Sequence, residues 1–206
     1  ILSLRDATDQ VQRRLDRLET LGDGEPDLNR FLSAEFKPAF LSAAARGESQ
    51  YAAVPLDVRS AIDVRRRTLN PSDFGFHNAV RRRDGTIVFV DFEYFGWDDP
   101  VKMVADFVQH PAMSLDECQR MHVIAGLSEI FADDETFACR LSALAPLIGL
   151  RWCLIMLNEF LPERWRRRVL AGIGLDQRQA KQIQLRKARR RLAAVRAYIG
   201  GTGSWH

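Results

Sequence analysis

Apolar residues recur every three or four positions along most of this 206-residue chain, the spacing that gives an α-helix one apolar face. In the first third, this pattern predicts helices over residues 4–21, 27–46 and 56–68. A loop over 47–55 would join the last two. Pro38 should kink or divide the second helix, because a proline ring removes one backbone donor and clashes with the preceding turn.

The second half of the chain shows the same periodicity. It predicts helices over residues 101–110, 114–131, 134–161 and 176–199. Pro146 is expected to divide the third of these into two helices. Residues 147–161 are apolar on nearly all sides, which is typical of a buried central helix. Residues 200–206 are expected to form a loose end.

A β-hairpin is predicted between these two helical parts. Two short apolar runs, 79–83 and 86–90, flank Asp84-Gly85, a dipeptide that favours a tight hairpin turn because its residues tolerate positive φ. We therefore expect a mainly α fold with a small β-hairpin at its active face.

The hairpin would bring metal-binding side chains together. With a two-residue turn, Val80 faces Phe89 and Asn78 faces Asp91, and directly opposed Cβ atoms lie roughly 5 Å apart. An amide oxygen and a carboxylate at that separation can share Mg²⁺, which takes oxygen ligands. Asp73 precedes the pair in a Pro/Ser/Gly loop. A loop carboxylate beside a metal-binding pair is the arrangement that phosphoryl transfer requires.

These residues carry a resemblance to a known family. The spacing Asp73-x-x-x-x-Asn78, a hairpin and then Asp91 resembles the catalytic core of the aminoglycoside phosphotransferase and choline kinase group, distant relatives of the protein kinases. Residues 96–100, Gly-Trp-Asp-Asp-Pro, resemble the Gly-x-x-Asp-Pro that follows the metal aspartate in that group. The resemblance implies the helical C-terminal lobe of a protein-kinase-like fold.

The resemblance also implies a role for each site residue. Asp73 would be the catalytic base, and Asn78 and Asp91 would bind Mg²⁺ on ATP, with GTP not excluded. Glu93 would extend the acidic cluster towards a second metal or an arginine. Asp99 would hydrogen-bond the backbone of the catalytic loop, although a helix N-cap is its simpler interpretation.

Two departures from the family pattern stand out. Pro71-Ser72 occupies the place of the usual His-Gly before the first aspartate. The literal Asp-Phe-Gly at 73–75 lies in the catalytic-loop position, whereas the metal position reads Asp-Phe-Glu at 91–93. The first departure concerns the local architecture of the loop more than its chemistry.

The resemblance divides the chain into three parts. Residues 1–69 would be helices before the catalytic loop, 70–100 the loop, hairpin and metal segment, and 101–206 a helical substrate subdomain with a basic C-terminal helix. No Gly-rich loop or strand lysine precedes Asp73, so we expect the N-terminal nucleotide lobe to be absent from this chain. The surface facing that lobe should be apolar, and either the lobe or a second copy of the chain in a homodimer would cover it. By itself the chain should bind nucleotide poorly and be inactive.

Polar residues interrupt the apolar stretch 147–161. Arg151, Asn158 and Glu159 need partners if they are buried, so they could tie helices together. Alternatively, Trp152, Asn158 and Glu159 could line a substrate pocket. Both interpretations stay open on the sequence.

Charge is distributed unevenly along the chain. Residues 161–206 carry 12 lysines and arginines against two acidic residues, whereas residues 1–160 carry 18 against 25. A basic helix packed on an acidic body explains this asymmetry. A nucleic-acid surface is disfavoured because Trp165 is the one aromatic that accompanies the arginines of 164–196.

Composition indicates a cytoplasmic protein without a membrane segment. No apolar run approaches the roughly 20 residues of a membrane span, and the first residues lack a signal-peptide pattern. Cys118, Cys139 and Cys153 lie in apolar helical contexts and are expected to be buried free thiols.

Together these patterns lead to one functional expectation and one alternative. The chain is expected to transfer the terminal phosphoryl group of ATP to a hydroxyl of an aminoglycoside-, choline- or sugar-like small molecule. The alternative is a catalytically inactive kinase-like scaffold with a basic interaction surface. No motif in the sequence specifies the acceptor.

Overall fold

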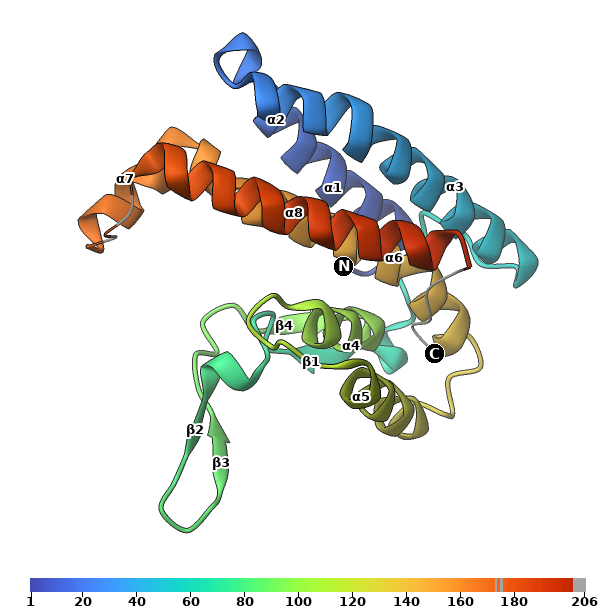
Figure 1. Cartoon of the computed structure of the whole chain (residues 1–206). Coiled ribbons are helices and arrows are strands. Elements are labelled where there is room, and N and C mark those ends of the chain that lie inside the picture. Colours follow the sequence, from blue (N-terminus) through green and yellow to red (C-terminus); the bar gives the residue numbers. More distant parts are fainter. Residues whose placement is uncertain (173, 175, 202–206) are drawn as a thin grey trace.

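A computed structural model describes residues 1–172, 174 and 176–201 (Figure 1). The chain is mainly helical, with two small antiparallel sheets of two strands each, which confirms the expected fold class at that level. The loose end expected for 200–206 lies, from residue 202 onward, outside the described residues.

The elements follow one another in a simple order. The helices are α1 (Leu4–Glu19), α2 (Pro26–Arg30), α3 (Lys37–Ala53), α4 (Pro100–Gln109), α5 (Glu117–Ile130), α6 (Phe137–Met156), α7 (Pro162–Leu170) and α8 (Gln177–Ile199). The strands are β1 (Thr68–Asn70), β2 (Ala79–Arg81), β3 (Ile87–Phe89) and β4 (Gly96–Asp98). In Figure 1, α4, α5 and the strands lie below α6 and α8, while α1–α3 lie above them.

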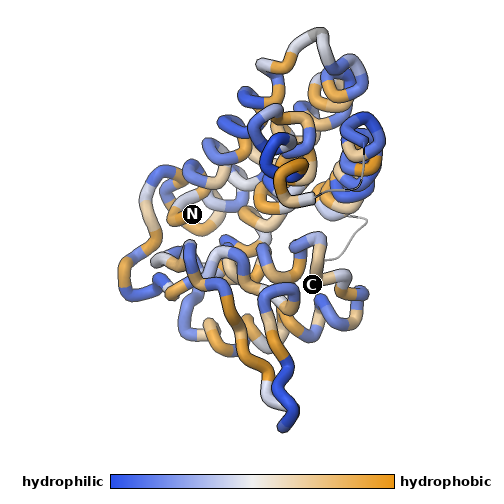
Figure 2. The backbone as a smooth tube through the Cα atoms, turned by 90° about the vertical axis from the view of Figure 1, so that its left-hand side faces the viewer, coloured by the Kyte–Doolittle hydropathy of each residue, from blue (hydrophilic) through white to orange (hydrophobic). Residues whose placement is uncertain are grey.

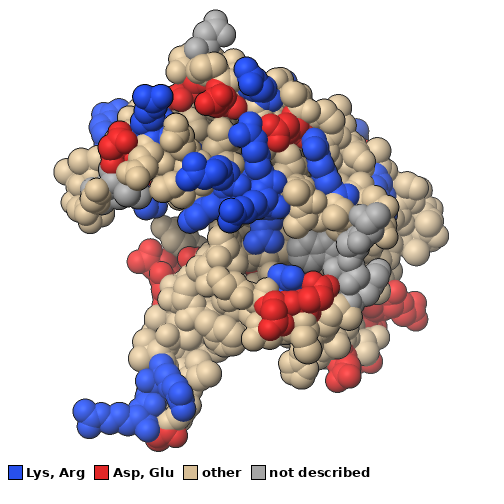
Figure 3. Space-filling model, viewed as in Figure 1, with Lys and Arg blue, Asp and Glu red and all other residues tan. Residues whose placement is uncertain are grey.

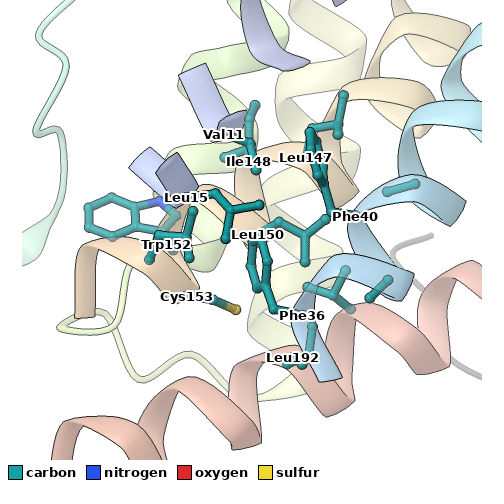
Figure 4. Close-up of a cluster of buried hydrophobic side chains, with 14 of the residues drawn as sticks. Val11, Leu15, Phe36, Phe40, Leu147, Ile148, Leu150, Trp152, Cys153 and Leu192 are labelled. Atoms are coloured by element: carbon teal, nitrogen blue, oxygen red, sulfur yellow. The ribbon is translucent and has the colours of Figure 1, made fainter. Parts of the chain in front are cut away.

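Helix α6 is the centre of the fold. It packs against α1, α3, α4 and α8, and its residues Leu147, Ile148 and Leu150 are fully buried. Figure 4 shows them among side chains of α1, α3 and α8. Within the described residues, Phe137–Phe160 is the one helical stretch long and apolar enough to cross a membrane, and most of it is buried inside the protein, as in a core helix.

The predicted break at Pro146 is wrong, because α6 runs through it. A proline inside a helix leaves the carbonyl four residues earlier without its usual donor. That carbonyl belongs to Ser142, and it accepts a hydrogen bond of 3.3 Å from the Tyr198 hydroxyl of α8. A tertiary contact therefore compensates for the lost backbone bond. Pro38 lies in the first turn of α3, and helical residues run without a gap from α2 through a π-helical segment, Phe31–Phe36, into α3, so the helix changes type before the proline but is not divided.

The predicted loop over 47–55 is wrong for most of its length. Helix α3 continues to Ala53, and Gly47 lies inside it. A Cβ atom at Gly47 would come within 3.0 Å of the Leu4 side chain. The glycine therefore permits the close packing of α1 on α3.

The predicted helix over 56–68 is also wrong; turns and a short 3₁₀ helix, Val64–Arg66, replace it. The side chains of Asp57 and Asp63 accept hydrogen bonds from backbone amides two residues further on. Such local side-chain bonds compete with helical ones. The Ile62 amide donates instead to Leu2, 2.8 Å away.

The hairpin forms around Asp84-Gly85 as predicted, but its register is shifted by one residue. Val80 faces Val88 rather than Phe89. The Arg82 amide donates to the Thr86 carbonyl at 2.8 Å and closes a three-residue loop, with Gly85 at a φ of 88°. A left-handed glycine ending a three-residue loop is a favoured hairpin connection.

The basic C-terminal part packs on acidic residues of the first helices, as the charge distribution suggested. In α8, Arg189 binds Glu35 at 2.9 Å and Lys181 binds Glu25.

The cysteine prediction holds only in part. Cys153 is buried and free, but Cys118 is exposed, because α5 has no buried face among its described residues.

Candidate active site

The segment before Asp73 is held by side chains of β1 and by the backbone near β4. Asn70 donates to Asp98 at 3.3 Å, and its own oxygen accepts from the Ser72 amide at 3.0 Å. The Ser72 hydroxyl donates to the carbonyl of Tyr94 at 2.8 Å. These bonds attach the loop to the segment that follows the hairpin.

Two residues of this region have a left-handed backbone. Ser72 has a φ of 64° and Asp91 a φ of 65°, a conformation uncommon for residues other than glycine. Ser72 stands where the resembled family has glycine, which adopts this conformation without strain. Strained residues concentrate at functional sites, so both positions point to this region.

Asp73 lies beside two histidines. Its Oδ1 atom is 3.0 Å from His77 Nε2 and 3.3 Å from His110 Nε2. The two imidazole rings stack in parallel with centroids 4.0 Å apart. The Asp73 side chain is 44% exposed, so a ligand can reach it from solvent.

The wall behind His110 is buried and hydrogen-bonded. Trp152 of α6 meets His110 edge to face, with ring centroids 4.4 Å apart, and its Nε1 donates to Asp106 at 2.9 Å. Arg151 also binds Asp106 and reaches Gln10 of α1. This part of the central helix therefore does tie helices together, as one of the two interpretations held.

Burial chiefly lowers the pKa of His110 below its ordinary value, and the neighbouring His77 lowers it further, while Asp73 and Asp106 oppose the shift. The imidazole is therefore held in its neutral form near pH 7. Its Nε2 hydrogen can then be donated to the Asp73 carboxylate.

The three side chains are close enough to suggest a metal site, since all ligand atoms lie within 4.8 Å of one another. The stacking argues against it. An ion in the plane of one imidazole would lie well out of the plane of the other, so both lone pairs cannot point at one ion. We interpret the cluster as a hydrogen-bonded setting for Asp73.

Asn78 and Asp91 lie next to the two paired strands of the hairpin but are not directly opposed. The register places Asn78 opposite Val90, whose amide donates to the Asn78 carbonyl at 2.8 Å, and Asp91 comes one residue later. The expected cross-strand pair is therefore wrong by one position. The Asn78 side chain donates to the Asp73 carbonyl at 2.9 Å, which connects the metal candidate to the loop of the base candidate.

The carboxylates of Asp91 and Glu93 are exposed. Among the described residues neither makes a side-chain hydrogen bond or ion pair. Both are thus free to bind a ligand from solvent.

Asp99 does not support the catalytic loop, contrary to the role that the resemblance implied. Its carboxylate caps α4 at the Val101 amide, 2.9 Å away, and forms two bonds with Arg140 of α6. The preceding residue, Asp98, makes the bond to the loop through Asn70. Asp98 ends β4 and Asp99 is the N-cap of α4, so these adjacent aspartates face different partners.

A pocket of about 490 Å³ opens beside this cluster. Trp152, Asn158 and Glu159, the three residues proposed from the sequence as pocket-lining, all border it, and so does His110. Glu159 is buried, and one of its oxygens binds Arg168 at 2.9 Å. The remaining wall comes from Pro111 and Ala112 after α4, from Ile155 and Met156 of α6, and from α7 and α8.

An exposed apolar surface covers the hairpin and the strands beside it. Its members are Leu69, Phe76, Val80, Ile87, Val90, Phe92, Tyr94, Phe95 and Trp97, each at least 44% exposed. Figure 2 shows the hairpin strands as hydrophobic and their tip as hydrophilic. The hairpin and the strands beside it therefore carry exposed apolar side chains, and the expectation that a nucleotide lobe or a second copy of the chain covers them stays a prediction.

Comparison with protein-family models, with curated proteins and with solved structures gives no match. The functional assignment therefore rests on the residues and their arrangement.

The sequence did not indicate the two histidines. His77 follows Asp73 by four residues, a spacing that brings two side chains together on a helix. The sequence gives no sign that this short loop is helical. His110 ends α4, remote from Asp73 in sequence. Only the packing of α4 against α6 brings it to the loop.

Proposed function

We propose that this protein is a phosphotransferase that uses ATP to phosphorylate a hydroxyl group of a small molecule, with Asp73 as the base. One observation carries the proposal: Asp73 contacts both Asn78, a candidate metal ligand, and His110, which borders a pocket of small-molecule size. The Asn78 side chain donates to the Asp73 carbonyl. The His110 imidazole contacts the Asp73 carboxylate and also borders the pocket.

Asp73 accepts the proton of the acceptor hydroxyl as that oxygen attacks the terminal phosphorus. Its exposed side allows the approach, and the imidazoles of His77 and His110 hold its carboxylate in place through one oxygen. The second oxygen makes no side-chain bond to another described residue. That oxygen is the one available to the substrate.

Asn78 and Asp91 suit Mg²⁺ by their chemistry. The Asn78 amide nitrogen is occupied by the Asp73 carbonyl, which leaves its oxygen as a ligand, and the Asp91 carboxylate is exposed. Oxygen donors are the ligands that Mg²⁺ prefers. When bound, the ion neutralises charge on the nucleotide phosphates. Glu93 adds a nearby carboxylate for a second ion or for a cationic side chain.

The test is phosphoryl transfer by the full-length product of the gene that encodes this chain, with Mg²⁺, ATP and a panel of hydroxylated small molecules. Release of ADP that depends on the acceptor is the expected result. Asp73→Asn should lower kcat by about 10²–10⁴-fold, the usual effect of losing a positioned base. GTP in place of ATP shows which nucleotide is used.

Asp84→Asn is the matched control. Asp84 lies at the exposed hairpin tip, where its side chain accepts from the Thr86 amide, a bond that asparagine can also make. This variant should keep its activity. An inactive scaffold would instead show no acceptor-dependent release of ADP, and unchanged turnover in Asp73→Asn would refute the assignment of the base.

A further inference from the structure

The pocket beside Asp73 has a basic wall. Arg164, Arg167 and Arg168 of α7 and Ala171 directly after it border the pocket, and their spacing places them on one face of a helix. Gln184 and Lys187 of α8 border it from the other side. A helix face turned towards the body of a protein is normally apolar, so arginines on this face call for an explanation.

The positive charges of this wall are not balanced within it. Glu159 is the one acidic residue among the described residues that border the pocket, and it is already paired with Arg168. The side chains of Arg167 and Lys187 form no ion pair with a described residue. Figure 3 shows lysine and arginine side chains gathered above the hollow below α8.

The surroundings add to the positive field. Burial chiefly lowers the pKa of Arg14, and the nearby charges of Arg151, Arg164 and Arg17 lower it further. Two of these neighbours are already paired, Arg151 with Asp106 and Arg17 with Glu163, whereas Arg164, Arg167 and Lys187 form no ion pair with a described residue. An anion bound here would therefore gain favourable interactions with several cations.

The floor of the pocket also holds an unused acceptor. Glu159 is 4% exposed, and its Oε2 atom is buried without a hydrogen-bond partner among the described residues. A buried polar atom without a partner costs free energy. A substrate hydroxyl can donate to it, and the Asn158 side chain borders the same space.

We propose that the acceptor of this phosphotransferase is an anionic polyol, a hydroxylated small molecule that carries a carboxylate or a phosphate. Arg164, Arg167 and Lys187 bind its charge, Glu159 accepts from one hydroxyl, and another hydroxyl reaches Asp73 past His110. That the anion is phosphorylated rests on the proposed function, whereas the negative charge of the ligand is inferred from the pocket alone. It disfavours aminoglycosides and choline, because cations are repelled by this wall.

The experiment compares molecules that differ in charge and share a hydroxylated ring. Glucose, glucuronate and glucose 6-phosphate are the neutral, carboxylate and phosphate probes, and kanamycin and choline are the cationic ones. Binding is measured by calorimetry without nucleotide, and ADP release is measured separately with Mg²⁺ and ATP. At least one acid should bind tenfold or more tightly than glucose, and comparison of the two acids shows which anionic group is preferred.

Arg167→Glu and Arg166→Glu are a matched pair of variants. Both residues are exposed and lie on α7, but only Arg167 borders the pocket. Arg167→Glu should weaken binding of the acid at least tenfold and raise its KM with little change in kcat. Arg166→Glu should bind the acid as the unmodified protein does.

Each result bears on the two proposals differently. Acid binding that Arg167→Glu weakens, without ADP release from any probe, would refute the phosphotransferase and leave the anion site standing. ADP release with glucose, kanamycin or choline and no preference for the acids would support the reaction and overturn the anionic acceptor. Equal effects of the two variants, or displacement of the acid by a short single-stranded oligonucleotide at lower concentration, would also overturn it.

Discussion

Arg140 is expected to be the most costly polar side chain to remove, because it neutralises a carboxylate with almost no access to water. Asp99 is 1% exposed and Arg140 4%. Two hydrogen bonds join them, Nε to Oδ2 at 2.8 Å and Nη2 to Oδ1 at 3.1 Å. Asp99 caps α4 immediately after β4, so this pair fixes the strand that holds the loop of Asp73.

The loss of stability in Arg140→Met can be estimated from the hydrogen bonds that Asp99 and Asp134 would keep. In Arg140→Met, the Asp99 carboxylate retains the Val101 amide at one oxygen, and the other oxygen is buried without a donor. Asp134, the second partner of Arg140, keeps its bonds from Thr136 and Arg66. Breaking a buried ion pair on one side costs about 3–5 kcal/mol, and we assign most of that cost to Asp99.

The free energy of unfolding is measured by urea denaturation followed by circular dichroism. Adding Asp99→Asn to Arg140→Met should recover about 1–3 kcal/mol, since the buried charge is gone and asparagine also caps helices. Arg13→Met, at an exposed position of α1, should change stability by less than about 0.5 kcal/mol. A loss below about 1 kcal/mol in Arg140→Met, or no recovery in the double variant, would refute the reasoning.

Two further predictions concern the loop and the ion-pair network. Gly75→Ala should displace His77, because a Cβ atom there would lie 2.7 Å from the imidazole and 2.8 Å from the Met113 sulfur, and we expect at least a tenfold loss of kcat. The control Gly96→Ala, whose Cβ atom would have no atom within 4 Å, should be tolerated. Equal activities of the two variants would contradict the loop geometry. Burial raises the pKa of Asp134, but hydrogen bonds from Arg140 and Thr136 outweigh it and hold that pKa below its ordinary value of 3.8. The charged form therefore stabilises the fold above about pH 4 and loses that contribution as the pH falls further. The stability difference between the unmodified protein and Asp134→Asn, measured by urea denaturation between pH 3 and 7, should shrink as the pH is lowered; a constant difference would contradict the assignment.

Local patterns in the sequence were enough for most of the helices and for the hairpin. The apolar spacing of α1, α6 and α8 is strong because these helices each bury a face or their whole circumference, and burial is what the spacing records. Asp84-Gly85 identified the turn because its chemistry is local. The pocket residues Trp152, Asn158 and Glu159 could be proposed because polar groups are rare within a buried apolar stretch.

Tertiary structure decided the rest. Pro146 stays within α6 because Tyr198 of α8 supplies the donor that its preceding turn lacks. The hairpin loop has three residues instead of the expected two, so the register shifts by one and Asn78 pairs with Val90 instead of Asp91. Register depends on the turn, here on the backbone conformation of Gly85. The contacts of Asp73 with His110, and of Arg164 and Arg167 with the pocket beside it, depend on how α4, α6, α7 and α8 pack. No local pattern encodes contacts between residues so far apart in the chain.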